Sequence, residues 1–323
     1  MPKTNIPAAV GRAARGLVLA LILLAQPWGR ADAAGILPAP EKVSDHVYAW
    51  IGPLDGPNKK NRGYRMNLSF VVGTQAVLVF DTGYTREMAD EMIAHIRNFT
   101  PLPIRYAVNS NSQPHRHFGN EAFHAAGAEL ISTPEEIARM ADMGGMFAQF
   151  GAQALGLPDG SVKAPLSPVT GLTAARTLDL GGVRVMLRPV GGNHTPNSVI
   201  AEIPADKIIL AGDVLYSGRL LAILDVSRTG HWLKVFDKLR DYKGYTFVPG
   251  HGRPAALWDF EFPTYRYLAE TWTHMIRAVK AGVGLDDAVK AFDQSAFAKL
   301  ANFELLAGVN ANWAYQQAEF EAL

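Results

Sequence analysis

The chain has 323 residues, of which 48% are hydrophobic and 19% are charged, with a formal net charge of +1. These values are typical of a folded protein with a sizeable core, and nothing in the charge pattern indicates nucleic-acid binding. Cysteine is absent, which excludes disulfides, thiolate metal ligands and a cysteine nucleophile. Any metal ion must therefore be held by imidazole, carboxylate or weaker oxygen donors.

The start of the chain has the pattern of a secretory signal. A basic segment precedes the apolar run at residues 16–25, and Ala31-Asp32-Ala33 provides a small-residue cleavage site. The apolar run is too short to span a bilayer comfortably. We predict a signal peptide over residues 1–33 and no integral membrane segment in the mature chain. An uncleaved anchor is the alternative.

Hydrophobic periodicity predicts strands and helices in two successive halves. The first half has apolar strand-like runs at 46–52, 68–73, 76–83, 104–108 and 128–133, with helices over 85–100, 121–127 and from Thr133 onward. Thr133-Pro134-Glu135-Glu136 is a capping box. We expect Gly144-Gly145 to interrupt the helix that follows it, and Met140, Met143 and Met146 to fill core space.

The second half predicts strands again and then helices. The strand-like runs lie at 177–182, 183–190, 198–204, 207–213 and 245–251, with an amphipathic helix over 230–242 and helices beyond residue 258. The segment 57–65, PNKKNRGYR, indicates a solvated basic loop, with a substrate-contacting flap as the alternative. We expect Asp225 and Arg228 to lie in a solvated loop. The alternative is that they line a substrate groove.

Four loops share one design, in which an apolar run and a nearby glycine accompany a potential metal ligand. The first, VNSNSQPHRHFGN at 108–120, contains His115 and leads into a helix, and the other three end in His194, Asp213 and His251. Strand-to-helix loops are where α/β proteins keep chemistry. We therefore expect the four loops to form one shared pocket.

These motifs resemble the metallo-β-lactamase fold superfamily. VLVFDTG, the loop ending in Gly119-Asn120, GGNHTP, AGDVLYSGR and VPGHG follow its order and spacing over about residues 46–254. The C-terminal helices and NANWAYQQAEFE are similar to those of periplasmic members associated with quinoprotein relays and sulfur oxidation. The resemblance implies a periplasmic location and an α/β fold, an αββα sandwich over residues 34–257 with a helical C-terminal appendage over 258–323.

The resemblance also implies hydrolysis of an ester, amide or thioester at a site with one or two zinc ions. Such an ion lowers the pKa of bound water to roughly 7 and polarises the scissile carbonyl. By position, His194 matches a ligand of the first metal, Asp213 the bridging carboxylate and His251 a ligand of the second metal. Asp81 matches a buried carboxylate that orients the loops.

The HxHxDH motif of the superfamily is degenerate here. Its four ligand positions fall on Asn111, Gln113, His115 and Arg116. Beginning the motif at His115 instead fails, because it puts Gly119 and Asn120 at ligand positions. The first metal position keeps two neutral amides and one imidazole, so we expect weak zinc binding there. The second metal position keeps His115, Asp213 and His251. Three such ligands with one open coordination position are typical of a catalytic zinc site.

Arg116 opposes any metal at the second position. At an effective dielectric of about 20, two unit charges ~4 Å apart interact by roughly 4 kcal/mol, and a divalent ion doubles that energy. We expect Arg116 either to point away from the metal or to replace it by pairing with Asp213.

The leading hypothesis is a metal-dependent hydrolase of a small-molecule substrate, with one zinc ion held by His115, Asp213 and His251. Asp213 and Arg116 would be catalytic, with Arg116 holding an anionic group or oxyanion. His194 would be a further metal ligand or would contact the substrate. Asp81, Asn111 and Gln113 would lie around the metal ligands and hold them in position. The alternative is a catalytically silent, metal-free binding or accessory protein with a periplasmic quinoprotein partner. This ligand set disfavours a true β-lactamase.

Overall fold

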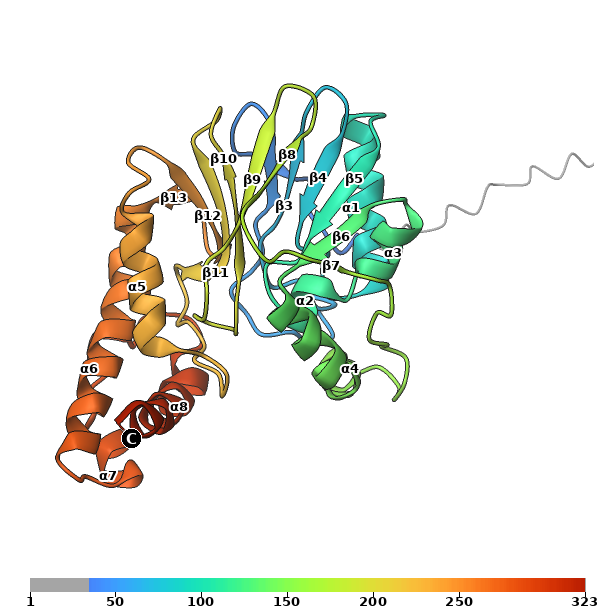
Figure 1. The fold of residues 1–323 in the computed structure, drawn as a ribbon. Coiled ribbons are helices and arrows are strands. Elements are labelled where there is room, and N and C mark those ends of the chain that lie inside the picture. The colour runs from blue at the N-terminus through green and yellow to red at the C-terminus, as the bar shows by residue number, and fades with distance from the viewer. Residues whose placement is uncertain (1–34, 323) are drawn as a thin grey trace, which may run out of the picture. The chain divides into compact units, whose positions relative to one another are not determined.

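Two β-sheets pack face to face, and helices cover their outer faces (Figure 1). The computed structural model describes residues 35–322, so the predicted signal peptide at 1–33 lies outside the described residues. The first sheet has the order β1 (Glu41–Lys42), β2 (Val47–Trp50), β3 (Leu68–Val72), β4 (Val77–Phe80), β5 (Ile104–Val108), β6 (Glu129–Ser132) and β7 (Thr170–Gly171). It is antiparallel from β1 to β4 and parallel from β4 to β7.

The second sheet has the order β13 (Ala255–Ala256), β12 (Thr246–His251), β11 (Ile208–Tyr216), β10 (Val199–Ile203), β9 (Arg184–Pro189) and β8 (Arg176–Asp179). Only β11 and β12 are parallel among its paired strands. This pairing brings the ends of β11 and β12 to one edge, where Asp213 and His251 lie.

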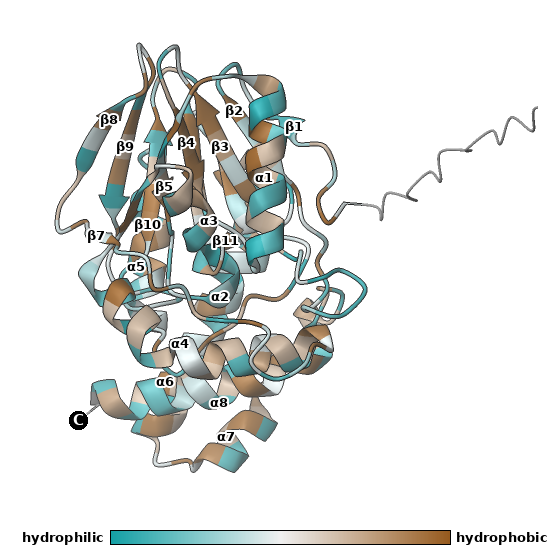
Figure 2. Ribbon diagram, turned by 90° about the vertical axis from the view of Figure 1, so that its right-hand side faces the viewer, coloured by the Kyte–Doolittle hydropathy of each residue, from teal (hydrophilic) through white to brown (hydrophobic). Residues whose placement is uncertain are grey.

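Side-chain alternation along the strands builds the layers. In β4, Leu78 and Phe80 enter the core between the sheets, while Val77 and Val79 face the core under the outer helices. Both sides of this strand are buried because successive side chains point to opposite faces. Figure 2 accordingly shows β3 and β4 as largely hydrophobic, whereas α1 (Arg86–Phe99) has a hydrophilic outer side.

Helices α1 and α3 (Asn120–Ala125) cover the first sheet, and α5 (Thr229–Leu239) covers the second. The short α2 (Pro114–His117) and the long α4 (Pro134–Leu155) flank the edge where the loops meet (Figure 1). This arrangement is the predicted αββα sandwich, and the fold class is confirmed. None of the helices within residues 35–322 is long and apolar enough to cross a membrane.

Helix α4 differs from its prediction, because it runs without a break through Gly144-Gly145. A Cβ at Gly144 would lie 2.8 Å from the Cβ of Ala164, so this glycine permits close packing rather than ending the helix. Each glycine costs about 1 kcal/mol relative to alanine, which a capped helix of 22 residues tolerates. Met146 is 41% exposed and is not core filler, contrary to expectation.

The C-terminal part is helical, as predicted. It contains the short turns Leu257–Phe260, Glu261–Arg266 and Ser295–Phe297 and the helices α6 (Tyr267–Lys280), α7 (Leu285–Ala291) and α8 (Phe303–Ala322). Its core includes Tyr216 at the end of β11 and Leu220 and Leu221 from the loop that follows. Asn310 of α8 accepts a hydrogen bond from the Ile223 amide and donates to the Leu221 carbonyl, each at 2.8 Å. The helices therefore hold the loop that leaves the candidate site.

Candidate functional site

Loops from both sheets meet at one edge and bring three predicted ligands together. One ligand atom from each of His115, Asp213 and His251 lies within 4.8 Å of the other two, and all three residues are buried. His115 follows β5 on α2, Asp213 lies in β11, and His251 ends β12. A register shift at Gly212, where φ is +52°, interrupts the β11–β12 pairing just before Asp213. Irregularities of this kind re-aim a side chain next to a site.

Arg116 forms the strongest contacts in the site. Its side chain is fully buried, and its Nε and Nη2 donate to the Asp213 carboxylate oxygens Oδ2 and Oδ1 at 2.9 and 2.6 Å. Nη1 donates to Asp81 Oδ2 and to the Asn67 carbonyl, both at 2.9 Å, and Nη2 also donates to the Gly250 carbonyl at 3.1 Å. These five bonds use all five guanidinium donors.

The predicted role of Arg116 therefore requires correction. No donor remains for the anionic group or oxyanion that we expected it to hold, so we assign Arg116 to positioning Asp213. Burial alone would raise the pKa of Asp213, but the Arg116 guanidinium outweighs burial and holds that pKa well below its usual range. Asp213 is an ionised carboxylate at neutral pH. Gly250 is required beside this pair, because a Cβ there would overlap Asp213 Oδ1 and lie 2.6 Å from Arg116 Nη2.

Asp81 joins β4 to the loop after β5. Its Oδ1 accepts from the Ser110 amide at 2.7 Å, and its Oδ2 accepts from the Ser110 hydroxyl at 3.0 Å and from Arg116. These are the loop-orienting contacts that the resemblance implied. Burial raises the pKa of Asp81 to about 6, although Arg116 opposes the rise.

The two histidines are neutral, and both direct Nε2 toward Asp213. Burial lowers the pKa of both His115 and His251 well below the usual value, and neighbouring arginines lower it further. His251 Nδ1 donates to the Arg65 carbonyl at 2.9 Å, so its Nε2 is unprotonated and faces Asp213 Oδ1 at 3.4 Å. His115 Nε2 lies 3.5 Å from Asp213 Oδ2 and has no hydrogen-bond partner although it is buried.

A family model for the metallo-beta-lactamase superfamily matches residues 62–251. The chain belongs to the metallo-β-lactamase superfamily. Among solved structures it is similar to a metallo-beta-lactamase from Pontibacter korlensis, with 18% identity, a TM-score of 0.56, and coverage of 71% of this chain and 98% of that one. It is also similar to the metallo-beta-lactamase IND-7, with 17% identity, a TM-score of 0.55, and coverage of 71% and 97%. These two likenesses show the fold.

Metals are usual in the metallo-β-lactamase superfamily, and the site fits one ion. His115 Nε2 lies 3.5 Å from Asp213 Oδ2, His251 Nε2 lies 3.4 Å from Asp213 Oδ1, and one ligand atom from each of the three residues lies within 4.8 Å of the others. These separations leave room for a metal ion between the three side chains. A lone pair on His251 Nε2 repels the carboxylate oxygen it faces unless a cation or proton lies between them. The donor set of two neutral imidazoles and one carboxylate is suitable for zinc.

The two amide residues expected at the first metal position, Asn111 and Gln113, lie beside Asp213 and at the N-cap of α2. The Asn111 side chain donates its amide to Asp213 Oδ2 at 2.9 Å, and its oxygen accepts from the Gln113 amide nitrogen at 2.8 Å. The oxygen is thus engaged away from the carboxylate. Gln113 is half-buried and begins α2 without a side-chain capping bond.

His194 lies outside the group of three, although we predicted it as a ligand. Its Nδ1 bonds to the Ala222 carbonyl at 2.8 Å, and its Nε2 faces the Tyr216 hydroxyl at 3.4 Å. The Tyr216 ring stacks on His251 with 5.1 Å between centroids. Tyr216, which the sequence motifs did not single out, therefore contacts both histidines.

Sequence reasoning also missed the role of Glu136. We predicted it as part of a helix cap, and its backbone amide does donate to Thr133 Oγ1. Its buried carboxylate instead accepts from the Ser112 and Asn197 amides, each at 2.8 Å. It thereby joins the loop of His115 to the loop of His194.

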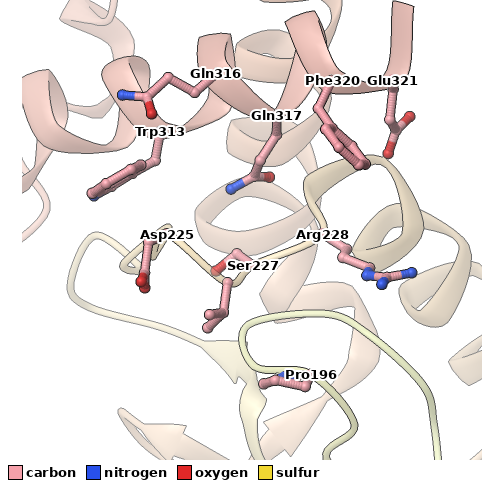
Figure 3. A pocket seen from close by; sticks show the side chains of 10 residues that line it. Pro196, Asp225, Ser227, Arg228, Trp313, Gln316, Gln317, Phe320 and Glu321 are labelled. Atoms are coloured by element: carbon pink, nitrogen blue, oxygen red, sulfur yellow. The ribbon is translucent and has the colours of Figure 1, made fainter. Parts of the chain in front are cut away.

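A separate pocket of about 580 Å³ lies behind the His194 loop (Figure 3). It is lined by Asp225 and Arg228 together with Trp313, Gln317 and Phe320 of α8. Ser227 in its wall donates to the His194 carbonyl at 2.7 Å. Asp225 and Arg228 therefore line a groove, which was the alternative to a solvated loop.

Proposed function

We propose that this chain is a hydrolase that uses one divalent metal ion held by His115, Asp213 and His251. The observation that carries the proposal is the convergence of three buried ligand atoms within 4.8 Å, one of them on a histidine without any hydrogen-bond partner. Zinc is the ion that this donor set favours. The chemistry that such an ion supplies when bound is an activated water and polarisation of an ester, amide or thioester carbonyl.

The residues of the chain would prepare this chemistry. Arg116 holds Asp213 in one orientation and keeps it ionised. The Arg65 carbonyl fixes the His251 ring so that Nε2 faces the ion position. Asn111 orients Asp213 from a third direction. The site is thus remodelled from a two-metal arrangement to one metal with a buried guanidinium beside it.

We further propose that the chain is exported through a signal peptide at residues 1–33 and works in the periplasm. The mature protein would divide into a metallo-β-lactamase-like domain at 34–257 and a helical extension at 258–323. The resemblance of the C-terminal helices supports membership of the periplasmic subgroup associated with quinoprotein relays and sulfur oxidation. In that setting the substrate is a small molecule and a quinoprotein is the expected partner.

The second candidate function is a metal-free binding or accessory protein in the same setting. It is favoured by one observation, the pairing of both Asp213 oxygens with Arg116. In this case the guanidinium supplies to the carboxylate the positive charge that a metal supplies in the superfamily.

Metal analysis of the exported, purified chain separates the two functions. We expect about one zinc ion per chain in the unmodified protein and below about a tenth in His251→Ala, with loss of hydrolysis of a chromogenic ester or thioester. His124→Ala is the matched control, because His124 is exposed on α3 and outside the site. Metal below about a tenth per chain in the unmodified protein, with a melting temperature unchanged by chelator, would contradict the metallohydrolase and support the accessory protein.

A further inference from the structure

Two arginines beside the site have unsatisfied interior donors. Arg219 is 3% exposed, and its Nη1 is buried without a hydrogen-bond partner. Arg65 is half-buried, and its Nε is likewise enclosed without a partner. Within residues 35–322, neither has a carboxylate within 4.0 Å, whereas Arg116 is paired with two. We predicted a solvated loop over residues 57–65. This prediction is wrong for Arg65, because its Nε is enclosed by the protein.

Each arginine belongs to a segment that contacts His251 or its neighbour Tyr216. The Arg65 carbonyl accepts a hydrogen bond from His251 Nδ1 at 2.9 Å. Arg219 follows Tyr216 by three residues, and the Tyr216 ring stacks on His251. A backbone bridge between Arg219 and Ala301 and the bond from its Nε to the Leu220 carbonyl hold Arg219 in place. The two side chains come from different loops, and both lie near Tyr216, Asp213 and Arg116.

The charges in this region do not balance. Among residues 35–322, the guanidinium groups of Arg65, Arg116 and Arg219 have the carboxylates of Asp81 and Asp213 beside them, and the ion pairs of both carboxylates are with Arg116. An enclosed positive charge without a partner is costly, and a bound metal ion increases the excess.

We propose that Arg65 and Arg219 bind an oxyanionic group of the substrate, a carboxylate or a phosphate, next to the metal position. The inference rests on the proposed function only in taking the anion to be part of the substrate. Guanidinium groups match carboxylate and phosphate oxygens through paired N–H donors. The unpartnered Nη1 of Arg219 and Nε of Arg65 supply such donors from two different loops. Arg116 cannot serve this purpose because all its donors are used by the protein.

The test uses chelator-treated full-length protein, so that anion binding is measured without metal. Acetate and inorganic phosphate are titrated separately by calorimetry and by thermal melting in a buffer without other small oxyanions. We expect one of the two to bind and to raise the melting temperature, which also decides between carboxylate and phosphate. Arg219→Met and Arg65→Met should each weaken that binding at least about tenfold, as expected for the loss of a charge-assisted hydrogen bond. Arg105→Met, at an exposed position on β5, should leave it unchanged.

A second readout does not depend on the titration. Without anion, Arg219→Met should melt at a temperature equal to or above that of the unmodified protein, because it removes an enclosed, unpaired charge. The inference is overturned if neither anion binds the unmodified protein, or if both methionine variants bind as tightly as Arg105→Met. Zinc content of the untreated protein is measured in parallel. Anion binding without zinc would reject only the metallohydrolase, and zinc without anion binding would reject only this inference.

Discussion

Arg116 and Asp213 form a two-pronged ion pair in the interior, with Nη2–Oδ1 at 2.6 Å and Nε–Oδ2 at 2.9 Å. Both side chains are inaccessible to solvent. The pair lies where loops from the two sheets meet, and Arg116 also donates to Asp81 at the end of β4. One guanidinium therefore connects β4 to β11 and limits how Asp213 presents its oxygens.

Replacing Arg116 should destabilise the protein strongly. Arg116→Met leaves two buried carboxylates without their partner, and breaking a buried pair in this way costs about 3–5 kcal/mol. Arg116→Lys keeps the charge but has only three donors for five acceptors, so its loss should be smaller. Denaturant unfolding measures both, with Arg105→Met as the surface control. A loss below about 1 kcal/mol in Arg116→Met would show that the pair does not stabilise the folded state.

Metal affinity should depend on His115 and not on His194. His115 Nε2 has no protein partner and lies 3.5 Å from Asp213, whereas His194 bonds to the Ala222 carbonyl and faces Tyr216. We expect His115→Ala to lower zinc affinity by at least about 100-fold and His194→Ala to change it by less than about tenfold. Competition with a chromophoric chelator measures both constants. Equal losses in the two variants would mean that His194 is a ligand and that the site differs from our assignment.

Two glycine substitutions should have opposite effects on stability. In Gly250→Ala the new Cβ overlaps Asp213 Oδ1, so overpacking should destabilise the fold by about 1–3 kcal/mol. In Gly145→Ala the new methyl group meets nothing within 4 Å on α4, and the helix should gain about 0.5–1 kcal/mol. Thermal and denaturant unfolding test the pair together. A neutral Gly250→Ala would show that the Asp213 loop adapts easily.

Asp206 should contribute stability that is lost in acid. Burial would raise the pKa of Asp206, but hydrogen bonds from the Ser44 hydroxyl and from His46 outweigh burial and lower that pKa below its usual 3.8. A carboxyl group with a lowered folded-state pKa stabilises the protein above its unfolded-state pKa, and the contribution disappears as pH falls through the folded-state value. The melting-temperature difference between the unmodified protein and Asp206→Asn should narrow as the pH falls below about 4. A difference independent of pH down to about 2.5 would contradict the role of the ionised carboxylate.

The sequence by itself determined the fold and the candidate ligands. Strand-like runs with short turns and ordered loop motifs specify the two sheets, because hydrophobic side chains of the required period can be buried in only a few ways. Parallel pairing of β11 with β12 then places Asp213 and His251 at one edge. The degenerate motif already indicated that the first metal position would be weak, since its residue types are amides.

The tertiary structure decided how each side chain is used. His115 and Arg116 are adjacent on α2. Only the packed structure shows that every N–H group of the Arg116 guanidinium donates to an oxygen of the protein. Likewise, the sequence around Arg65 is that of a basic loop and does not indicate that the Arg65 Nε is enclosed. Periodicity reports which face of an element is buried, whereas hydrogen-bond partners and uncompensated charges depend on residues distant in sequence. Those contacts exist only after the two sheets have packed together.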